Sequence, residues 1–273
     1  MRLTVRHKTK YRYETPLANA MQQLRLTPRN FAGQTVIEWS IDAPGISRAT
    51  TYHDAFGNIV HMVSAHDVIE EVEITASGIV DTEDKAGIVG EERGDMPPPL
   101  VFTRLTPLTQ PNQAIRRLGA IVQDHDDQIA GFHALMHAIR DKVDYRVGVT
   151  ETHATATSAL NAGEGVCQDH AHIFISAARS IGVPARYVSG YLLLEDEHAS
   201  EAHHAWAEVH IEGLGWLAFD ISNAICPTDH YIRLTTGLDS RSAAPIRGIR
   251  FGGTDENMNV EVEVEQTASQ QQQ

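Results

Sequence analysis

The sequence is poor in cysteine, with only Cys167 and Cys226 among its 273 residues. Small secreted domains usually carry several disulfides, so this scarcity argues against that class and predicts two reduced thiols. The first residues, MRLTVRHKTKYRYE, interleave charged and apolar side chains and contain no apolar core of a secretory signal. No stretch of the sequence approaches the roughly 20 apolar residues that are needed to cross a bilayer. These absences predict a cytoplasmic protein.

Positive charge is also scarce. Lys and Arg number 22 against 36 Asp and Glu, which gives a formal net charge of −14, and the longest basic run is Arg116-Arg117. An acidic chain is repelled by phosphate backbones and anionic lipid, so we expect neither nucleic acid nor a membrane as a partner. The hydrophobic content of 42% and the charged content of 21% are those of a globular protein. The length allows one large domain or two ordinary ones.

The first 90 residues have the pattern of β-strands. Apolar and polar side chains alternate over 5–13, and the segment 35–41 is rich in β-branched and aromatic residues. The turn sequence DAFGN separates two strand-like segments, 50–52 and 59–63, which is typical of a hairpin. We therefore predict an antiparallel, β-sandwich-like domain over 1–90.

The rest of the chain is expected to form helices followed by strands. A linker is predicted over 91–112, because its prolines oppose both helix and central strand. Apolar residues then recur at helical spacing, and one helix should begin at Cys167 and end near Gly182. Strand-like segments follow this helix. We predict a second domain over 113–265, which includes the last strands, and a disordered polar tail over 266–273.

The most informative stretch is GEGVCQDH, in which a glycine-rich turn delivers Cys167 to the first turn of a predicted helix. The free N–H groups and the positive dipole end of a helix stabilise a thiolate. The same N–H groups can receive the oxyanion of an acyl intermediate. An inert buried cysteine is the alternative, because free cysteine is commonly buried, and this stretch by itself does not separate the two.

A histidine and an aspartate downstream favour the reactive thiol. HHAWAEV begins one predicted strand at His203, and WLAFD ends the next strand at Asp220, after a four-residue turn. In an antiparallel hairpin the start of one strand lies beside the end of the other, so His204 and Asp220 can be neighbours. The carboxylate would then hold one imidazole nitrogen and leave the other to face the thiol. Strand neighbours point to opposite faces, so only one of the two histidines can meet Cys167.

Four motifs in this order resemble those of the transglutaminase-like superfamily: GVCQD, GVPARYVSGY, HAWAEV and GWLAFD. Upstream, KTKYRYETPLANAMQQLRLTPR and YHDAFGNIVH are similar to the N-terminal β region that accompanies bacterial members, and APIRG resembles their C-terminal segment. The resemblance extends over nearly the whole chain. It implies an α+β fold, in which an N-terminal antiparallel β domain precedes a papain-like catalytic domain.

The resemblance implies Cys167 as the nucleophile, His204 as general base and acid, and Asp220 as the orienting carboxylate. The reaction would be acyl transfer on an amide bond of a peptide or protein, through a thioacyl intermediate, with water or an amine as acceptor. No cofactor and no metal are implied. Animal transglutaminases use a tryptophan well before the cysteine, but here the upstream tryptophan is Trp39, inside the β region, and no calcium-binding loop motif appears. We therefore expect hydrolysis to predominate over crosslinking.

Three further side chains are predicted to line the substrate site. They are Trp206, Tyr191 and His170. Tyr191 follows a glycine and could reach the active site, and His170 lies three residues after Cys167, close to the same side of the helix. For Trp206 and His170, packing in the core is the competing and preferred interpretation.

Two rival functions use the same part of the chain. One is a metal enzyme, which metal analysis and a chelator test would separate from a cysteine enzyme. Its ligands would be Cys167, His170, His172 or the His203-His204 pair. The other is a non-catalytic binding module of the same fold, although all three triad residues stand at matching positions. The histidines of 133–137 lack an HExxH pattern, and the acidic clusters 124–127 and 195–198 are interpreted as solvated surface rather than calcium sites.

Overall fold

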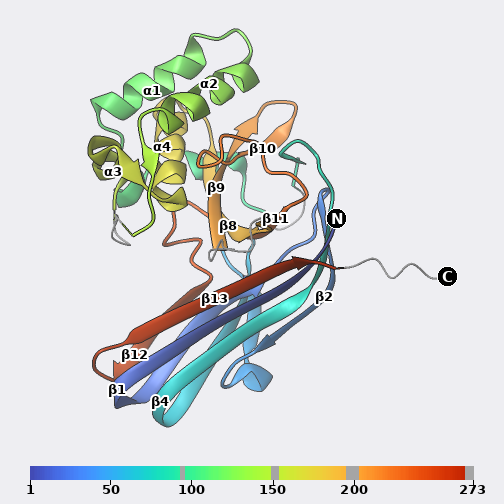
Figure 1. The fold of residues 1–273 in the computed structure, drawn as a ribbon, viewed down its shortest axis with the longest axis vertical. Coiled ribbons are helices and arrows are strands. Elements are labelled where there is room, and N and C mark those ends of the chain that lie inside the picture. Colours follow the sequence, from blue (N-terminus) through green and yellow to red (C-terminus); the bar gives the residue numbers. More distant parts are fainter. Residues whose placement is uncertain (93–95, 149–153, 195–202, 268–273) are drawn as a thin grey trace, which may run out of the picture.

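The computed structural model describes residues 1–92, 96–148, 154–194 and 203–267. Figure 1 shows an elongated antiparallel sheet beside a second half, in which helices pack on a smaller sheet. This is the α+β arrangement that the sequence predicts. Within the described ranges, no helix is both long and apolar enough to span a bilayer.

The elongated sheet has six antiparallel strands, with β1 and β4 at its centre. The order is β12-β1-β4-β2, while β13 also pairs with β1 and β3 with β4. The predicted hairpin is confirmed, since β3 and β4 pair Thr50 with Met62. The elements of this half are β1 (Arg2–Thr27), β2 (Gln34–Asp42), the 3-10 helix η1 (Ile46–Arg48), β3 (Thr50–His53), β4 (Ile59–Thr82), β12 (Ile246–Gly252) and β13 (Asn257–Gln266).

The buried face of β1 changes part-way along the strand. Leu3 is buried near its start, and Ala20 and Leu24 are buried near its end, so the inward positions switch from odd to even numbers. The switch coincides with an irregularity in the pairing with β4 between residues 12 and 17, where extra residues shift the alternation. Side chains from both halves of β1 belong to one hydrophobic cluster. A single bent sheet therefore encloses this core. The sequence pattern predicts a sandwich of two sheets instead.

Charge complementarity accompanies the docking of β13 on β1. Glu261 lies opposite Lys8, and Glu263 lies opposite Arg6, in the register of the two strands. On the other side of β1, Lys8 forms an ion pair with Glu73 of β4 at 3.0 Å. Opposite charges across neighbouring strands each contribute a few tenths of a kcal/mol, about 0.2–1. They favour this register over one that would place like charges together.

The division of the chain between the two sheets differs from the predicted one. The last strands of the predicted segment 113–265 belong to the first sheet, whereas β5 (Ile88–Gly90), expected in the first domain, pairs with β10 in the second. Free strand edges decide these pairings, because their N–H and C=O groups accept a compatible strand from any distance along the chain. Of the predicted tail, Gln266 ends β13, and 268–273 lie outside the described residues.

The segment expected to be a linker packs closely against the helical half. It contains two short 3-10 helices, η2 (Pro99–Thr103) and η3 (Pro107–Thr109). Phe102 is fully buried, and its carbonyl accepts a hydrogen bond from Nε of Arg179 at 2.8 Å. Proline thus prevents long regular elements here, as predicted, but it does not prevent tight packing.

In the described residues, the second half contains four α-helices and a five-stranded sheet of order β11-β8-β9-β10-β5. The helices expected after residue 112 and from Cys167 are confirmed. The helix α3 was not predicted, because its seven residues carry little periodic pattern. The elements are α1 (Gln113–Gln123), α2 (Gln128–Arg140), β6 (Asp144–Tyr145), α3 (Ala156–Ala162), β7 (Glu164–Gly165), α4 (Cys167–Ser180), β8 (Ala185–Leu192), β9 (His203–Ile211), β10 (Gly215–Phe219) and β11 (Tyr231–Gly237).

The helix α4 is at the centre of this half (Figure 1). Its buried residues, such as Ala171 and Phe174, share one hydrophobic cluster with Val209 of β9 and Phe219 of β10. The chain then reverses through Gly182, whose φ of 82° lies in the left-handed region, and enters β8. Because β8 runs back along α4, the first turn of α4 lies at the end of the sheet where β9 begins and β10 ends.

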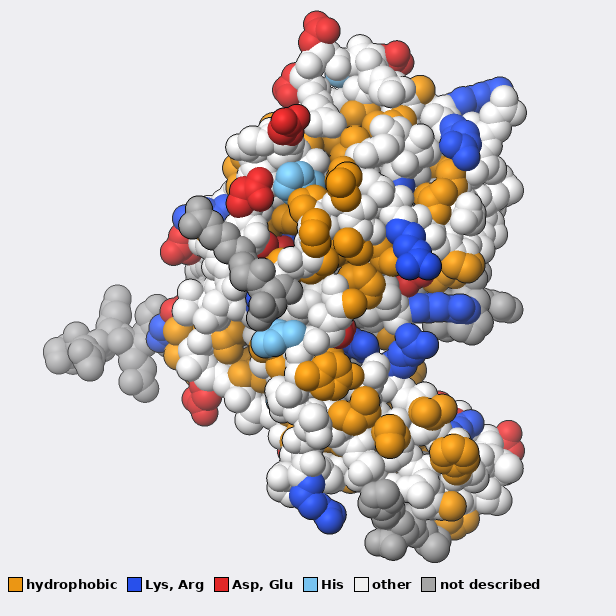
Figure 2. Space-filling view, turned by 180° about the vertical axis from the view of Figure 1, so that it is seen from behind, with side chains coloured by type: hydrophobic (Ala, Val, Ile, Leu, Met, Phe, Trp, Pro, Cys, Tyr) orange, Lys and Arg blue, Asp and Glu red, His pale blue; other side chains and the backbone are white. Residues whose placement is uncertain are grey.

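Charges of the two signs are separated on the face shown in Figure 2. Basic side chains lie mainly along the right side of the view, and acidic side chains lie toward the upper left of the helical half. Positive and negative side chains therefore occupy different regions of this face, although the chain as a whole is acidic.

Candidate active site

A glycine-rich turn places Cys167 at the first residue of α4. Gly163 has a φ of 71°, in the left-handed region that favours glycine. Gly165 leaves room for the side chain of Asp169, which a Cβ at this position would meet at 2.8 Å. Asp169 accepts a hydrogen bond from the N–H of Val166 at 2.9 Å. The turn is therefore fixed, and it holds the partly exposed Cys167 at the end of the helix where free N–H groups lie.

His204 and Asp220 meet across the hairpin of β9 and β10. Phe219 pairs with Ala207 in the register of these strands, so Asp220, one residue further on, is a diagonal neighbour of His204. Nε2 of His204 donates to Oδ2 of Asp220 at 2.7 Å. The Cys167 side chain also raises the pKa of His204, so the thiol lies near this ring, and the other ring nitrogen, Nδ1, is available to it. The thiol, the imidazole and the carboxylate of the predicted triad therefore lie in one region of the fold.

Asp220 and His204 are both in their charged forms. Burial alone would raise the pKa of Asp220, but hydrogen bonds from His204, Tyr231 and Asn223 outweigh it and hold that pKa below its usual range. Burial alone would lower the pKa of His204, but the hydrogen bonds to Asp220 and Cys167 outweigh it and raise that pKa to about 10. An imidazolium beside a thiol favours the thiolate. The electrostatics therefore suit a nucleophilic sulfur.

His203 points to the opposite face of β9. Its Nε2 lies 2.9 Å from the hydroxyl of Ser189, and its ring faces His7 of the first sheet at 6.1 Å. Burial and the neighbouring charge of His204 lower the pKa of His203 to about 4. Of the two adjacent histidines, His204 is therefore the one that contacts the aspartate and lies near the cysteine.

Two family models match the chain. The model of the transglutaminase-like superfamily matches residues 116–221, and the model of the bacterial transglutaminase-like N-terminal region matches residues 3–81. The chain belongs to the transglutaminase-like superfamily. An uncharacterised protein of Mycobacterium leprae (strain TN) is 31% identical over 280 residues, which cover 98% of this chain and 99% of that protein.

Two further similarities extend over nearly the whole of this chain. An uncharacterised protein of Mycobacterium tuberculosis (strain ATCC 25618 / H37Rv) is 28% identical over 303 residues, which cover 97% of this chain and 92% of that protein. The crystal structure of a candidate cysteine protease from Cytophaga hutchinsonii superposes with a TM-score of 0.75 at 20% identity, covering 98% of this chain and 92% of that one. At this identity the likeness shows the fold alone. The predicted family and fold class are confirmed.

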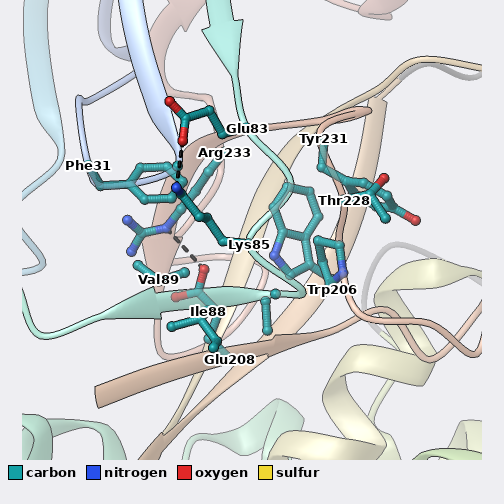
Figure 3. A pocket seen from close by; sticks show the side chains of 14 residues that line it. Phe31, Glu83, Lys85, Ile88, Val89, Trp206, Glu208, Thr228, Tyr231 and Arg233 are labelled. Atoms are coloured by element: carbon teal, nitrogen blue, oxygen red, sulfur yellow. Dashed lines mark ion pairs between the residues drawn. The ribbon is translucent and has the colours of Figure 1, made fainter. Parts of the chain in front are cut away.

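Trp206, two residues after His204 on β9, lines a pocket (Figure 3). The rings of Trp206 and His204 are stacked with their centroids 6.5 Å apart. Tyr231 also lines the pocket, and an ion pair at 3.1 Å between Arg233 and Glu208 lies in its wall. Trp206 is almost fully buried. It therefore acts as a wall behind the histidine, and its predicted contact with substrate stays a prediction.

The other two predicted substrate residues are engaged in packing. Tyr191 is fully buried, and its hydroxyl lies 2.9 Å from Nδ1 of His7, which places it at the contact with the first sheet. His170 is also fully buried. Its Nδ1 lies 2.8 Å from the hydroxyl of Ser222, and its Nε2 lies 3.0 Å from the carbonyl of Val143. Nδ1 of His170 thus holds the loop after β10 against α4, and Nε2 holds the segment after α2.

The residues predicted as possible metal ligands do not form one cluster in the part of the chain that the structure describes. There, no group of three His, Cys, Asp or Glu side chains is placed to hold a metal ion. Nε2 of His172 accepts a hydrogen bond from the N–H of Ser240 at 3.1 Å, and His133 lies beside Cys226, with Nε2 and Sγ 4.0 Å apart. The acidic cluster 195–198 lies outside the described residues.

Two residues around Asp220 escaped the sequence analysis. The side-chain amide of Asn223 and the hydroxyl of Tyr231 both donate to Oδ2 of Asp220 at 2.7 Å. The turn position of Asn223, three residues after Asp220, is a local signal that could have identified it. Tyr231 belongs to another strand, and no local pattern indicates its contact. Trp39, in contrast, donates to the carbonyl of Leu26 at 2.7 Å and belongs to the first sheet.

Proposed function

We propose that the protein catalyses cysteine-dependent acyl transfer on amide bonds of a peptide or protein, with Cys167, His204 and Asp220 as its catalytic triad. The observation that carries the proposal is the place of His204, which donates to Asp220 at 2.7 Å and whose pKa the nearby Cys167 side chain helps to raise. A thiol beside a histidine that a carboxylate orients is the arrangement of activated cysteine nucleophiles. Membership of the superfamily and the fold shared with a candidate cysteine protease support a cysteine-based reaction.

The first half of the proposed reaction forms a thioester. The Cys167 thiolate attacks the carbonyl carbon of the amide, a C–S bond forms, and the π electron pair moves to the oxygen. N–H groups at the start of α4 stabilise this oxyanion. His204 gives its proton to the amide nitrogen, the C–N bond breaks, and the amine leaves. Asp220 keeps the imidazole ring aimed throughout.

The second half releases the acyl group. Water, or a second amine, attacks the thioester carbonyl while His204 takes its proton. The C–S bond then breaks, and the Cys167 thiolate is restored. We propose that water is the main acceptor, because an amine competes with abundant water only when the protein binds and orients it. Trp39, the tryptophan upstream of the cysteine, is engaged in the first sheet. A cytoplasmic location remains part of the proposal, and cell fractionation tests it.

A peptide assay tests the reaction. A glutamine-containing peptide is offered with excess primary amine, and the products are followed by mass spectrometry. We expect hydrolysed peptide from the wild type and from the control Cys226→Ala, and none from Cys167→Ala. Dominant amine incorporation that depends on Cys167 would make the protein a transglutaminase instead. Turnover that survives Cys167→Ala but stops in chelator would favour the metal enzyme.

A further inference from the structure

Asp220 is surrounded by hydrogen-bond donors. Oδ1 accepts from the backbone N–H groups of Ser222 and Asn223 at 3.0 and 3.3 Å. Oδ2 accepts from His204, from the Asn223 side chain and from Tyr231, each at 2.7 Å. The carboxylate is fully buried, so these contacts replace the water that a charged group would otherwise bind. Its ionised state therefore depends on donors that the fold supplies.

Tyr231 differs in its origin from the donors of Ser222 and Asn223. Ser222 and Asn223 belong to the turn that directly follows Asp220, and they move with it. Tyr231 is the first residue of β11, which lies at the opposite edge of the sheet from β10 and β5. Its hydroxyl therefore ties the end of β10 to a separate strand. Such a tie fixes the carboxylate relative to the sheet, whereas contacts within the turn fix it only relative to the turn.

The Tyr231 ring is itself firmly placed. It is 7% exposed, and it packs edge-on against Trp206, with centroids 5.5 Å apart and planes at 86°. The same ring lies 6.1 Å from that of His204. Burial, followed by the nearby Asp220 charge, raises the pKa of the Tyr231 hydroxyl. The hydroxyl therefore stays protonated and remains a donor at every pH at which the triad would work.

We propose that Tyr231 is a positioning residue for the triad, one that holds Oδ2 of Asp220 in line with Nε2 of His204. The inference rests on the proposed function, because it assigns the hydroxyl a role in keeping His204 charged and directed at Cys167. Tyr231 touches neither the thiol nor the substrate in this role. It acts through Asp220.

The loss of the hydroxyl has a defined electrostatic consequence. Donors to a carboxylate favour its ionised form, so the removal of one donor raises the pKa of the carboxyl group. In Tyr231→Phe, Asp220 would take up a proton at a higher pH and would be held in line with His204 less firmly, by the donors of the turn alone. The imidazolium would then lose its partner, and the Cys167 thiolate would lose the imidazolium.

Alkylation with iodoacetamide tests this without any known substrate. The labelling rates of Cys167 and Cys226 are measured in one sample by peptide mapping, over a range of pH. In Tyr231→Phe we expect Cys167 labelling near neutral pH to fall about tenfold, the effect of one hydrogen bond to a charged group. The acid limb of the Cys167 profile should move to higher pH, and Cys226 should be unaffected.

Two further variants separate positioning from packing. Tyr52→Phe is the matched control, because it also removes a tyrosine hydroxyl that hydrogen-bonds, here with Nε2 of Gln23 at 3.0 Å in the first sheet. It should label like the wild type. In an Asp220→Asn background, Tyr231→Phe should cost less than about threefold, because contacting residues that act through one another are not additive.

The outcomes distinguish the two proposals. If the wild-type Cys167 reacts faster than Cys226 but Tyr231→Phe matches Tyr52→Phe in rate and profile, the role of Tyr231 is overturned and the proposed function stands. Equal losses with and without Asp220 would also overturn it, since that is the result of a merely structural role. A wild-type Cys167 that reacts no faster than Cys226 would overturn both.

Discussion

The start of β9 presents two adjacent histidines to two different regions, the proposed triad on one face and the contact with the first sheet on the other. His204 donates to Asp220 and has its pKa raised to about 10. His203 lies against Ser189 and His7 and has its pKa lowered to about 4. Near neutral pH, His203 is thus neutral and His204 is positively charged.

The difference shows that burial alone does not make a histidine reactive. Burial lowers the pKa of both rings, because it disfavours the charged form. The pKa of His204 is raised because the carboxylate of Asp220 accepts a hydrogen bond from it, whereas the described groups that shift the pKa of His203 include no carboxylate. His7 follows the same rule, since burial and the nearby His203 lower its pKa to about 3. The partner decides the role.

The comparison predicts its largest effect in turnover. His204→Gln removes the acid and base of the proposed reaction and should lower kcat by about 10⁴-fold or more, as the loss of a triad member does. His203→Gln can keep a hydrogen bond to Ser189. It should leave kcat within about threefold, since a change on the face of β9 away from the proposed triad mainly affects stability. Steady-state hydrolysis of the peptide substrate measures both. Comparable losses in the two variants would end the functional distinction between the two faces.

The next prediction removes the carboxylate that makes the two histidines differ. In Asp220→Asn the ring of His204 loses its charged acceptor and becomes more like that of His203, so kcat should fall about 10²-fold or more. Alkylation of Cys167 should fall in parallel, because the imidazolium that supports the thiolate is lost. A variant with nearly unchanged kcat and labelling would show that Asp220 does not set the charge of His204.

The two histidines should also give stability of opposite pH dependence. The folded pKa of His203 lies below its ordinary value of 6.5, so its stabilisation is present above pH 6.5 and is lost as the pH falls toward 4. The loss amounts to at most about 2 kcal/mol near pH 5. The folded pKa of His204 lies above 6.5, so its stabilisation is present below pH 6.5 and is lost as the pH rises toward 10.

Urea unfolding at acid, neutral and alkaline pH measures these slopes. His203→Gln should reduce the loss of unfolding free energy on acidification, and His204→Gln should reduce the loss on alkalinisation. The two variants serve as each other's control, since they differ only in which face of β9 is changed. The same slope in both would mean that other groups dominate the titration.

The smallest expected effect compares the two thiols. Cys226 lies beside His133, with Sγ and Nε2 4.0 Å apart, and burial, followed by the charge of Asp84, raises the pKa of its thiol to about 11. Cys167 lies at a helix start beside the charged His204, so iodoacetamide should label it about tenfold faster near neutral pH. Equal rates at the two sites would show that His204 does not activate Cys167.

Local patterns explain which parts of the fold were predictable. The helix α4 and the hairpin of β3 and β4 depend on residues within a few positions of one another, so their sequence signals were sufficient. The places of β12, β13 and β5 were not predictable, because alternating strands carry no label for the sheet edge they join. Their partners lie up to the full length of the chain away, as the pairing of Leu3 with Gln266 shows.

For the candidate site, the sequence by itself determined the start of α4 at Cys167 and the nearness of His204 to Asp220, because a turn and a hairpin bring these residues together through short-range geometry. Only the tertiary structure decided that Tyr191 faces His7 and that Tyr231 donates to Asp220. Those contacts join separate strands across a packed core. The direction of a side chain there depends on how whole sheets and helices pack, which no local pattern encodes.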